Sequence, residues 1–158
     1  MTTWQQNAAP NAKPRLRVAP NGVRSEAPAV FELMESLGET FLPYQKLFLH
    51  DALMVDEHGA YLAQEACIAA CRQLGKTFCG IARVLYGALV EEERLIAMSS
   101  HQQATSRESF KNILAYFENY TDLSKRVHRV VAAIGRESIE LKNGVSIRFP
   151  SRTRQSTR

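Results

Sequence analysis

The feature that most constrains this chain is the run Gly75-Lys76-Thr77, which follows an apolar stretch and opens a helical pattern. A strand, a tight turn and then Gly-Lys-Thr at the start of a helix is the layout of a phosphate-binding loop. In such a loop, successive backbone N–H groups surround an anion, and the positive end of the helix dipole faces it. The lysine then reaches the β- and γ-phosphates of a nucleoside triphosphate, and the threonine hydroxyl binds Mg²⁺.

The motif departs from the usual consensus at its first position. Ala70 stands where G-x-x-x-x-G-K-[ST] has its first glycine. A glycine there frees the backbone torsions at the end of the strand, so Ala70 predicts a different turn. The alternative is that Gly-Lys-Thr occurs by chance. The apolar stretch before it and the helical pattern after it favour a true loop.

The apolar periodicity along the chain predicts an alternation of helices and strands. A strand, a helix and a second strand around the loop indicate a parallel βαβ unit. Asn143-Gly144, flanked by alternating apolar residues, predicts a β-hairpin. The expected helices cover 30–37, the stretch from Pro43 to about His58, 76–91, 101–120 and 122–133; the expected strands cover 64–70 and 94–100, and the hairpin covers 137–149.

Two regions differ in composition from the rest. Residues 1–29 are rich in proline and in basic side chains, which predicts a disordered basic arm before a single domain over 30–158. The arm is either a solvated tail or a contact for nucleic acid or a partner subunit. The last segment carries Arg152, Arg154 and Arg158 between Ser, Thr and Gln, and is either a phosphate-contacting loop or a flexible basic tail.

Charge, hydropathy and the cysteine and histidine residues limit the class of protein and the kinds of site that are expected. The net charge of +4 is compatible with a polyanionic partner, and no apolar run approaches the roughly 20 residues that span a membrane. Cys67, Cys71 and Cys79 cluster around the loop and predict small, buried, reduced thiols. Half a zinc site is the alternative for Cys67 and Cys71, but no second Cys/His pair follows. We interpret His101 as a polar loop residue, because no carboxylate or nucleophile pattern accompanies it.

Taken together, these motifs resemble the large subunit of tailed-bacteriophage terminases, the ATPases that package viral DNA. The resemblance covers roughly residues 41–158. It rests on Gln45 before the loop, on Arg-Gln-Leu-Gly-Lys-Thr in the loop, on a strand ending in Ser-Ser-His-Gln-Gln-Ala, and on a hairpin followed by an Arg/Ser/Thr-rich segment. That family often lacks the first glycine of the loop and carries an arginine where Arg72 stands.

The resemblance implies a P-loop NTPase-like three-layer α/β fold with a mostly parallel sheet, and ATP with Mg²⁺ as cofactors. Arg72 and Lys76 are then the catalytic residues, with Arg72 contacting the γ-phosphate, and the Thr77 hydroxyl binds Mg²⁺. Gln45 contacts adenine, and Tyr44 stacks on it. Without the resemblance, we interpret Gln45 as a surface residue. The residues expected to bind the nucleotide are Tyr44, Gln45, Arg72, Gln73, Leu74, Gly75, Lys76 and Thr77.

The chain also departs from the family. There, a strand ending in an Asp-Glu pair follows, then a coupling motif and a nuclease domain; here the sequence stops at Arg158 before any such strand, and we expect no apolar run that carries two adjacent acids. We therefore expect a terminase fragment or a truncated gene product. Its α/β fold would be incomplete because the acidic-strand half is missing, and it would hydrolyse ATP weakly or not at all. The strand at 64–70 would expose apolar surface and an unpaired edge.

The resemblance implies double-stranded DNA as a partner, with Arg152, Arg154 and Arg158 contacting its phosphates. It also implies self-association, a small terminase subunit and the portal or procapsid as partners, in the cytoplasm of a bacterial host. Two other functions remain open. One is a helicase-like P-loop ATPase, which also uses an upstream glutamine. The other is a non-catalytic basic module that binds nucleic acid or a partner.

Overall fold

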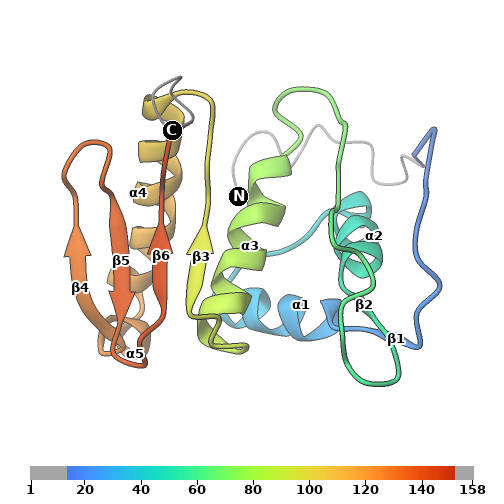
Figure 1. Cartoon of the computed structure of the whole chain (residues 1–158). Helices are drawn as coiled ribbons and strands as arrows, with labels where there is room; N and C mark the ends of the chain where they lie inside the picture. Colours follow the sequence, from blue (N-terminus) through green and yellow to red (C-terminus); the bar gives the residue numbers. More distant parts are fainter. Residues whose placement is uncertain (1–13, 152–158) are drawn as a thin grey trace. The chain divides into compact units, whose positions relative to one another are not determined.

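The computed structural model of this protein describes residues 14–151, and these residues form a mixed α/β structure (Figure 1). The chain divides into two compact units, the first ending at Cys79 and the second beginning at Gly80. The predicted α/β class is therefore confirmed. Each unit has its own small sheet.

The first unit contains two helices and a two-stranded sheet. Helix α1 spans Ala27–Ser36 and α2 spans Pro43–Ala52, each with a proline in its first turn, where the missing N–H costs nothing. Strand β1 (Arg24–Ser25) pairs antiparallel with β2 (Met54–Val55). The expected basic arm thus ends earlier than predicted, because β1 and the start of α1 lie within 14–29; residues 1–13 lie outside the described residues.

Three aromatic rings connect the first unit to the start of α3, which spans Lys76–Leu89. The ring centroids of Phe31 and Phe41 are 5.0 Å apart, and those of Phe41 and Phe78 are 4.9 Å apart, both tilted. Tilted pairs at this distance are favourable contacts between ring edges and faces. Within the first unit, the row therefore connects the first turn of α3 through Phe41 to α1.

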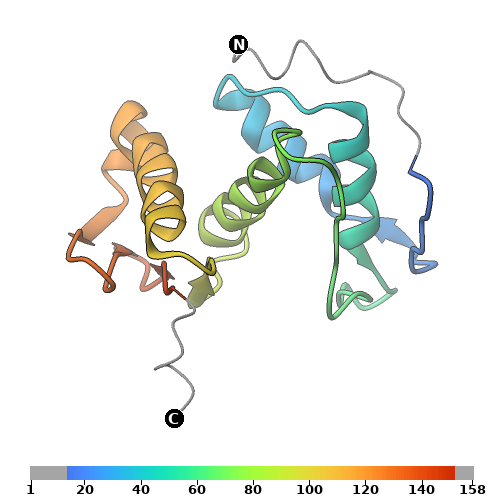
Figure 2. The ribbon, with the colours of Figure 1, turned by 90° about the horizontal axis from the view of Figure 1, so that it is seen from above.

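The second unit contains a four-stranded sheet in the order β3-β6-β5-β4. Its strands are β3 (Leu95–Ala97), β4 (Val127–Val131), β5 (Ser138–Leu141) and β6 (Ser146–Arg148). Helices α4 (Gln103–Asn119) and the short α5 (Thr121–Ser124) precede β4. Figures 1 and 2 show α4 on one face of the sheet, where Phe110 packs edge-on against Phe149 with ring centroids 5.4 Å apart.

The predicted hairpin is confirmed. Strands β5 and β6 pair antiparallel, with Ile139 opposite Ile147. The turn needs Gly144, whose φ of +89° favours glycine, and the backbone N–H of Gly144 donates to Leu141 at 3.0 Å. Both isoleucines are fully buried, so the alternation of apolar and polar residues set the buried face as expected.

Several predicted elements are wrong. Residues 64–70 form no strand, because three alanines give little β propensity and no strand of the described chain pairs with them. The expected βαβ unit is therefore absent from the described residues. The sheet is mixed rather than mostly parallel, since only β3 and β6 run parallel.

Two predicted helices have different bounds. The helix from Pro43 ends at Ala52, where β2 begins two residues later, rather than at His58. The helix expected over 122–133 is reduced to α5, because Val127, Val130 and Val131 are β-branched and pair with β5. The helices expected over 30–37, 76–91 and 101–120 are confirmed as α1, α3 and α4, and the strand expected over 94–100 as β3.

Candidate functional site

The turn from Ala70 to Thr77, here called the Gly-Lys-Thr loop, joins the extended segment after β2 to α3. Gly75 has a φ of +81°, which explains why glycine stands at this position. Gln73 also has a positive φ, +63°, an uncommon conformation for a side chain other than glycine, Asn or Asp. The backbone therefore changes direction twice before the helix begins.

Lys76 closes this loop with its own side chain. Its Nζ donates to the backbone carbonyl of Ala70 at 2.7 Å and to that of Cys71 at 2.6 Å. An ammonium group offers three donors, and neutral carbonyls compensate its charge only partly. The loop thus folds around a cation that has no acidic partner among these contacts.

The backbone of the loop keeps free donors. Phe78 N donates to Gly75 O at 3.1 Å and Leu74 N lies in a turn that starts at Cys71, but within the described residues the N–H groups of Gln73, Gly75, Lys76 and Thr77 have no backbone acceptor. These groups lie at the N-terminus of α3, where the helix dipole is positive. A run of unpaired N–H groups at a helix start is an arrangement that binds anions.

The first turn of α2 holds the loop from outside. The Gln45 amide is completely buried; its Nε2 donates to Gly75 O at 3.1 Å and its Oε1 accepts from Leu42 N at 2.8 Å. The Tyr44 hydroxyl donates to Leu74 O, and burial raises the pKa of Tyr44. Gln45 is therefore not a surface residue, and both ends of its amide are already hydrogen-bonded in this structure.

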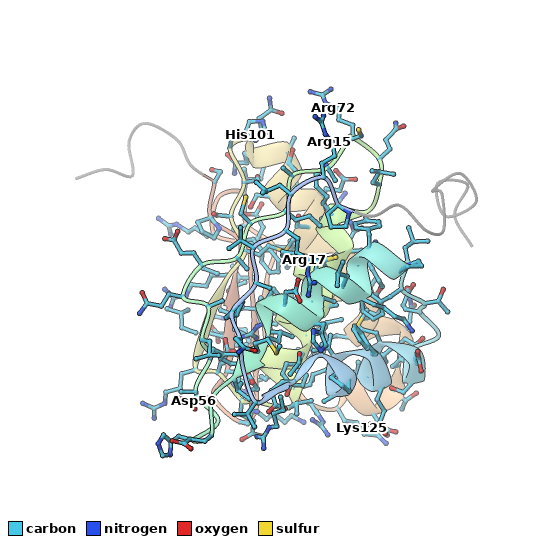
Figure 3. All side chains as sticks on the ribbon, turned by 90° about the vertical axis from the view of Figure 1, so that its right-hand side faces the viewer. Arg15, Arg17, Asp56, Arg72, His101 and Lys125 are labelled. Carbon is cyan, nitrogen blue, oxygen red and sulfur yellow. The ribbon has the colours of Figure 1, made fainter. Side chains whose placement is uncertain are left out.

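The remaining predicted nucleotide residues are exposed. Arg72, Gln73 and Thr77 are solvent-accessible, and Figure 3 shows Arg72 at the outer end of its loop, pointing away from the chain. His101 is also exposed, in the turn before α4, as expected for a polar loop residue. Arg152, Arg154 and Arg158 lie outside the described residues.

An Asp-Glu pair that sequence reasoning missed follows the short strand β2. Asp56 and Glu57 come directly after Val55, but Asp56 Oδ1 accepts from His58 N at 2.8 Å and Ala60 N at 2.9 Å, which closes a turn. Figure 3 shows Asp56 and Arg72 at opposite ends of the first unit. This pair therefore shapes a turn and lies away from the Gly-Lys-Thr loop.

A second feature without a sequence signal is the ion pair of Arg17 and Asp51. Arg17 Nε and Nη2 reach the two carboxylate oxygens of Asp51 at 2.7 Å each. The hydrogen bond from Arg17 lowers the pKa of Asp51 and outweighs burial, which acts in the opposite direction. These residues lie 34 positions apart, so no local pattern could have predicted the pair.

The cysteines differ from the prediction. Cys67 and Cys71 are exposed, and only Cys79 is buried, which raises its pKa to about 11. Among residues 14–151, no group of three His, Cys, Asp or Glu side chains is placed to hold a metal ion. The described residues thus offer no complete zinc site.

Comparisons with protein-family models, curated proteins and solved structures found no match to this chain. None of the helices within the described residues has the length and apolar character to cross a membrane.

Proposed function

We propose that the Gly-Lys-Thr loop binds the triphosphate of ATP, and that this chain is the nucleotide-binding part of a terminase large subunit. In this proposal, ATP binding is coupled to movement of double-stranded DNA. The full P-loop fold, with a three-layer arrangement, belongs to the same proposal. The observation that carries it is the position of Lys76, whose ammonium lies inside a loop with unpaired N–H groups at a helix start.

Each loop residue has a role that its contacts support. Lys76 exchanges the carbonyls of Ala70 and Cys71 for β- and γ-phosphate oxygens, which carry charge and are better acceptors for an ammonium. The N–H groups of the loop that have no backbone acceptor donate to the phosphates. The exposed Thr77 hydroxyl is free to bind Mg²⁺, which neutralises phosphate charge when bound.

Three further residues act in or next to the loop. Arg72 is exposed within it and carries a permanent charge, so it can swing onto the γ-phosphate without losing a buried contact. Gln45 and Tyr44 hold Gly75 and Leu74 in place. Contact of Gln45 with adenine stays part of the proposal, and it requires the amide to release Gly75 or Leu42.

Binding is tested by equilibrium titration with a fluorescent ATP analogue. Lys76→Ala removes charge-assisted hydrogen bonds to phosphate, worth about 1.5–3 kcal/mol each, so we expect affinity to fall by more than about tenfold. Lys111→Ala, an exposed lysine of α4, is the matched control and should bind like the parent chain. Equal affinity for the parent and Lys76→Ala, or binding independent of Mg²⁺, would overturn the proposal.

Hydrolysis by this chain is expected to be weak or absent. The family resemblance calls for an acidic pair on a strand next to the loop, and the Asp56-Glu57 pair lies at the other end of the first unit (Figure 3). Without an acid to orient water, binding proceeds without efficient attack on the γ-phosphate. A malachite-green phosphate assay checks this; robust turnover abolished by Lys76→Ala would contradict it.

The partners belong to the proposal as well. Arg152, Arg154 and Arg158 would contact DNA phosphates, and assembly with further large subunits, a small subunit and the portal or procapsid would follow from the packaging role. The net charge of +4 supports a polyanionic partner. Affinity for duplex DNA should fall steeply as salt rises, because released counterions drive such binding. A flat salt response would count against these contacts.

A further inference from the structure

The first unit contains a cavity of about 370 Å³ that the Gly-Lys-Thr loop does not account for. Three segments line it and leave it open to solvent: residues 14–20, one face of α2, and residues 63–74. We call residues 14–20 the strap. Cavities of this size lie at the lower end of the range that binds small molecules.

The lining is mainly apolar. Phe48, Leu47 and Ala52 contribute from α2, and a run of small residues around Ala66 contributes from the opposite wall. Tyr44 also lines the cavity, and its hydroxyl already donates to Leu74 O. Apolar walls with few free polar groups favour apolar ligands, because removing apolar surface from water lowers the free energy.

The charges of the lining are mostly neutralised. Arg17 and Asp51 both face the cavity, and they bind each other through two hydrogen bonds of 2.7 Å. A charged ligand would have to break this ion pair or enter the cavity without a group of opposite charge to bind, and both cost free energy. The third charged lining residue, Glu65, is exposed to water, and its charge disfavours anions.

The strap leaves apolar side chains uncovered. Leu16 is 83% exposed and Val18 is 88% exposed, although both residues line the cavity. The strap is held to α2 by the pair of Arg17 with Asp51 (Figure 3 labels Arg17 over α2). A ligand in the cavity would remove the part of their apolar surface that faces the cavity from water.

We propose that this cavity is a binding site for a small, uncharged and largely apolar molecule, closed on one side by the strap. The site is separate from the proposed phosphate contacts, because it uses neither Lys76 nor Thr77. It shares Ala70 and Leu74 with the Gly-Lys-Thr loop, and Tyr44 with the predicted adenine contacts, but none of the groups proposed to hold the phosphates or Mg²⁺. Binding here therefore does not depend on whether the loop binds ATP.

The test uses prodan, an uncharged naphthalene dye whose emission shifts to shorter wavelength in apolar surroundings. We expect saturable binding to the whole chain, weakened at least about tenfold by Ala66→Phe, which fills the cavity from one wall. Ala104→Phe, at an exposed alanine of α4, is the matched control and should leave binding unchanged. Circular dichroism checks that each variant is folded, and Ala69→Phe replaces Ala66→Phe if that variant unfolds.

The outcomes separate this site from the proposed function. Thr77→Ala, at an exposed residue that does not line the cavity, should retain prodan binding even though it loses the gain in nucleotide affinity that Mg²⁺ provides. The inference would be overturned if the parent chain bound no prodan saturably, or if the wall variants, Ala66→Phe and Ala69→Phe, bound prodan as tightly as the parent. The anionic naphthalene dye ANS should bind more weakly than prodan; tighter ANS binding that the wall variants also weaken would overturn the uncharged class.

Discussion

The Gln45 side chain donates a hydrogen bond to the backbone carbonyl of Gly75, 30 positions further along the chain, at 3.1 Å. Its other amide atom accepts from Leu42 N at 2.8 Å. The amide is fully buried, so these two hydrogen bonds replace the ones that its nitrogen and oxygen would make with water. One side chain thus connects the start of α2 with the last residue before α3.

This contact predicts a stability change. Gln45→Glu replaces the donor facing Gly75 O with an acceptor and buries a carboxylate, so we expect the free energy of unfolding to fall by about 1–3 kcal/mol or more. Urea denaturation measures this. Gln64→Glu, at an exposed position before the loop, should change stability by less than about 0.5 kcal/mol. Equal losses at both positions would contradict a specific role for the Gln45 amide.

A second prediction concerns Thr77. If its hydroxyl binds Mg²⁺, Thr77→Ala should abolish most of the gain in nucleotide affinity that Mg²⁺ provides, whereas Thr77→Ser should keep it. Isothermal titration calorimetry with and without Mg²⁺ checks this. The side chain is exposed, so neither change should affect folding. Unchanged Mg²⁺ dependence in Thr77→Ala would remove the metal role from this residue.

The pair of Arg17 and Asp51 predicts sensitivity to acid. The hydrogen bond from Arg17 holds the pKa of Asp51 below its ordinary value of 3.8. The stabilisation is therefore complete above that ordinary value and is lost as the pH falls through the lower folded pKa. Urea titrations should show that part of the stability lost between pH 7 and pH 3 disappears in Asp51→Asn.

The matched control for this prediction is Asp122→Asn, whose carboxylate is almost fully exposed beside Lys125. Exposed pairs contribute little, so this variant should lose stability on acidification like the parent chain. If Asp51→Asn behaves like the control, the pair does not stabilise the strap.

The cysteines predict two classes of reactivity. Cys67 and Cys71 are exposed, whereas Cys79 is buried and its pKa is raised to about 11. At pH 8, two thiols should react rapidly with Ellman's reagent and the third slowly, because only an accessible thiolate attacks. Cys79→Ser should remove only the slow phase. Three thiols reacting at one rate would contradict the buried position of Cys79.

We expect that shortening a buried side chain in the core of the second unit lowers stability strongly. Ile147 is fully buried between β3 and β5, so Ile147→Ala should lower the free energy of unfolding by about 2–5 kcal/mol. Ile134→Ala, at a side chain that is 69% exposed, should change it by less than about 0.5 kcal/mol. Chemical denaturation followed by circular dichroism compares them, and similar costs would place Ile147 outside the core.

Local patterns predicted part of the candidate site. The helix starting at Lys76 follows from residue type and from its neighbours in sequence. The helix predicted over 122–133 was wrong, because a short apolar run fits the periodicity of a helix or of a strand. Only the pairing with β5 makes part of this run a strand, β4. The burial of Gln45 and the ion pair of Arg17 with Asp51 had no local signal at all.

The sequence by itself determined the turn at Asn143-Gly144, the start of α3 and the alternation that buries Ile139 and Ile147. These depend on backbone torsions and periodicity, which act over a few residues. Tertiary structure alone decided that residues 64–70 pair with no strand of the described chain, that Gln45 holds Gly75, and that the strap lines a cavity. Such features require distant segments to meet, and their free energy comes from the groups that are brought into contact.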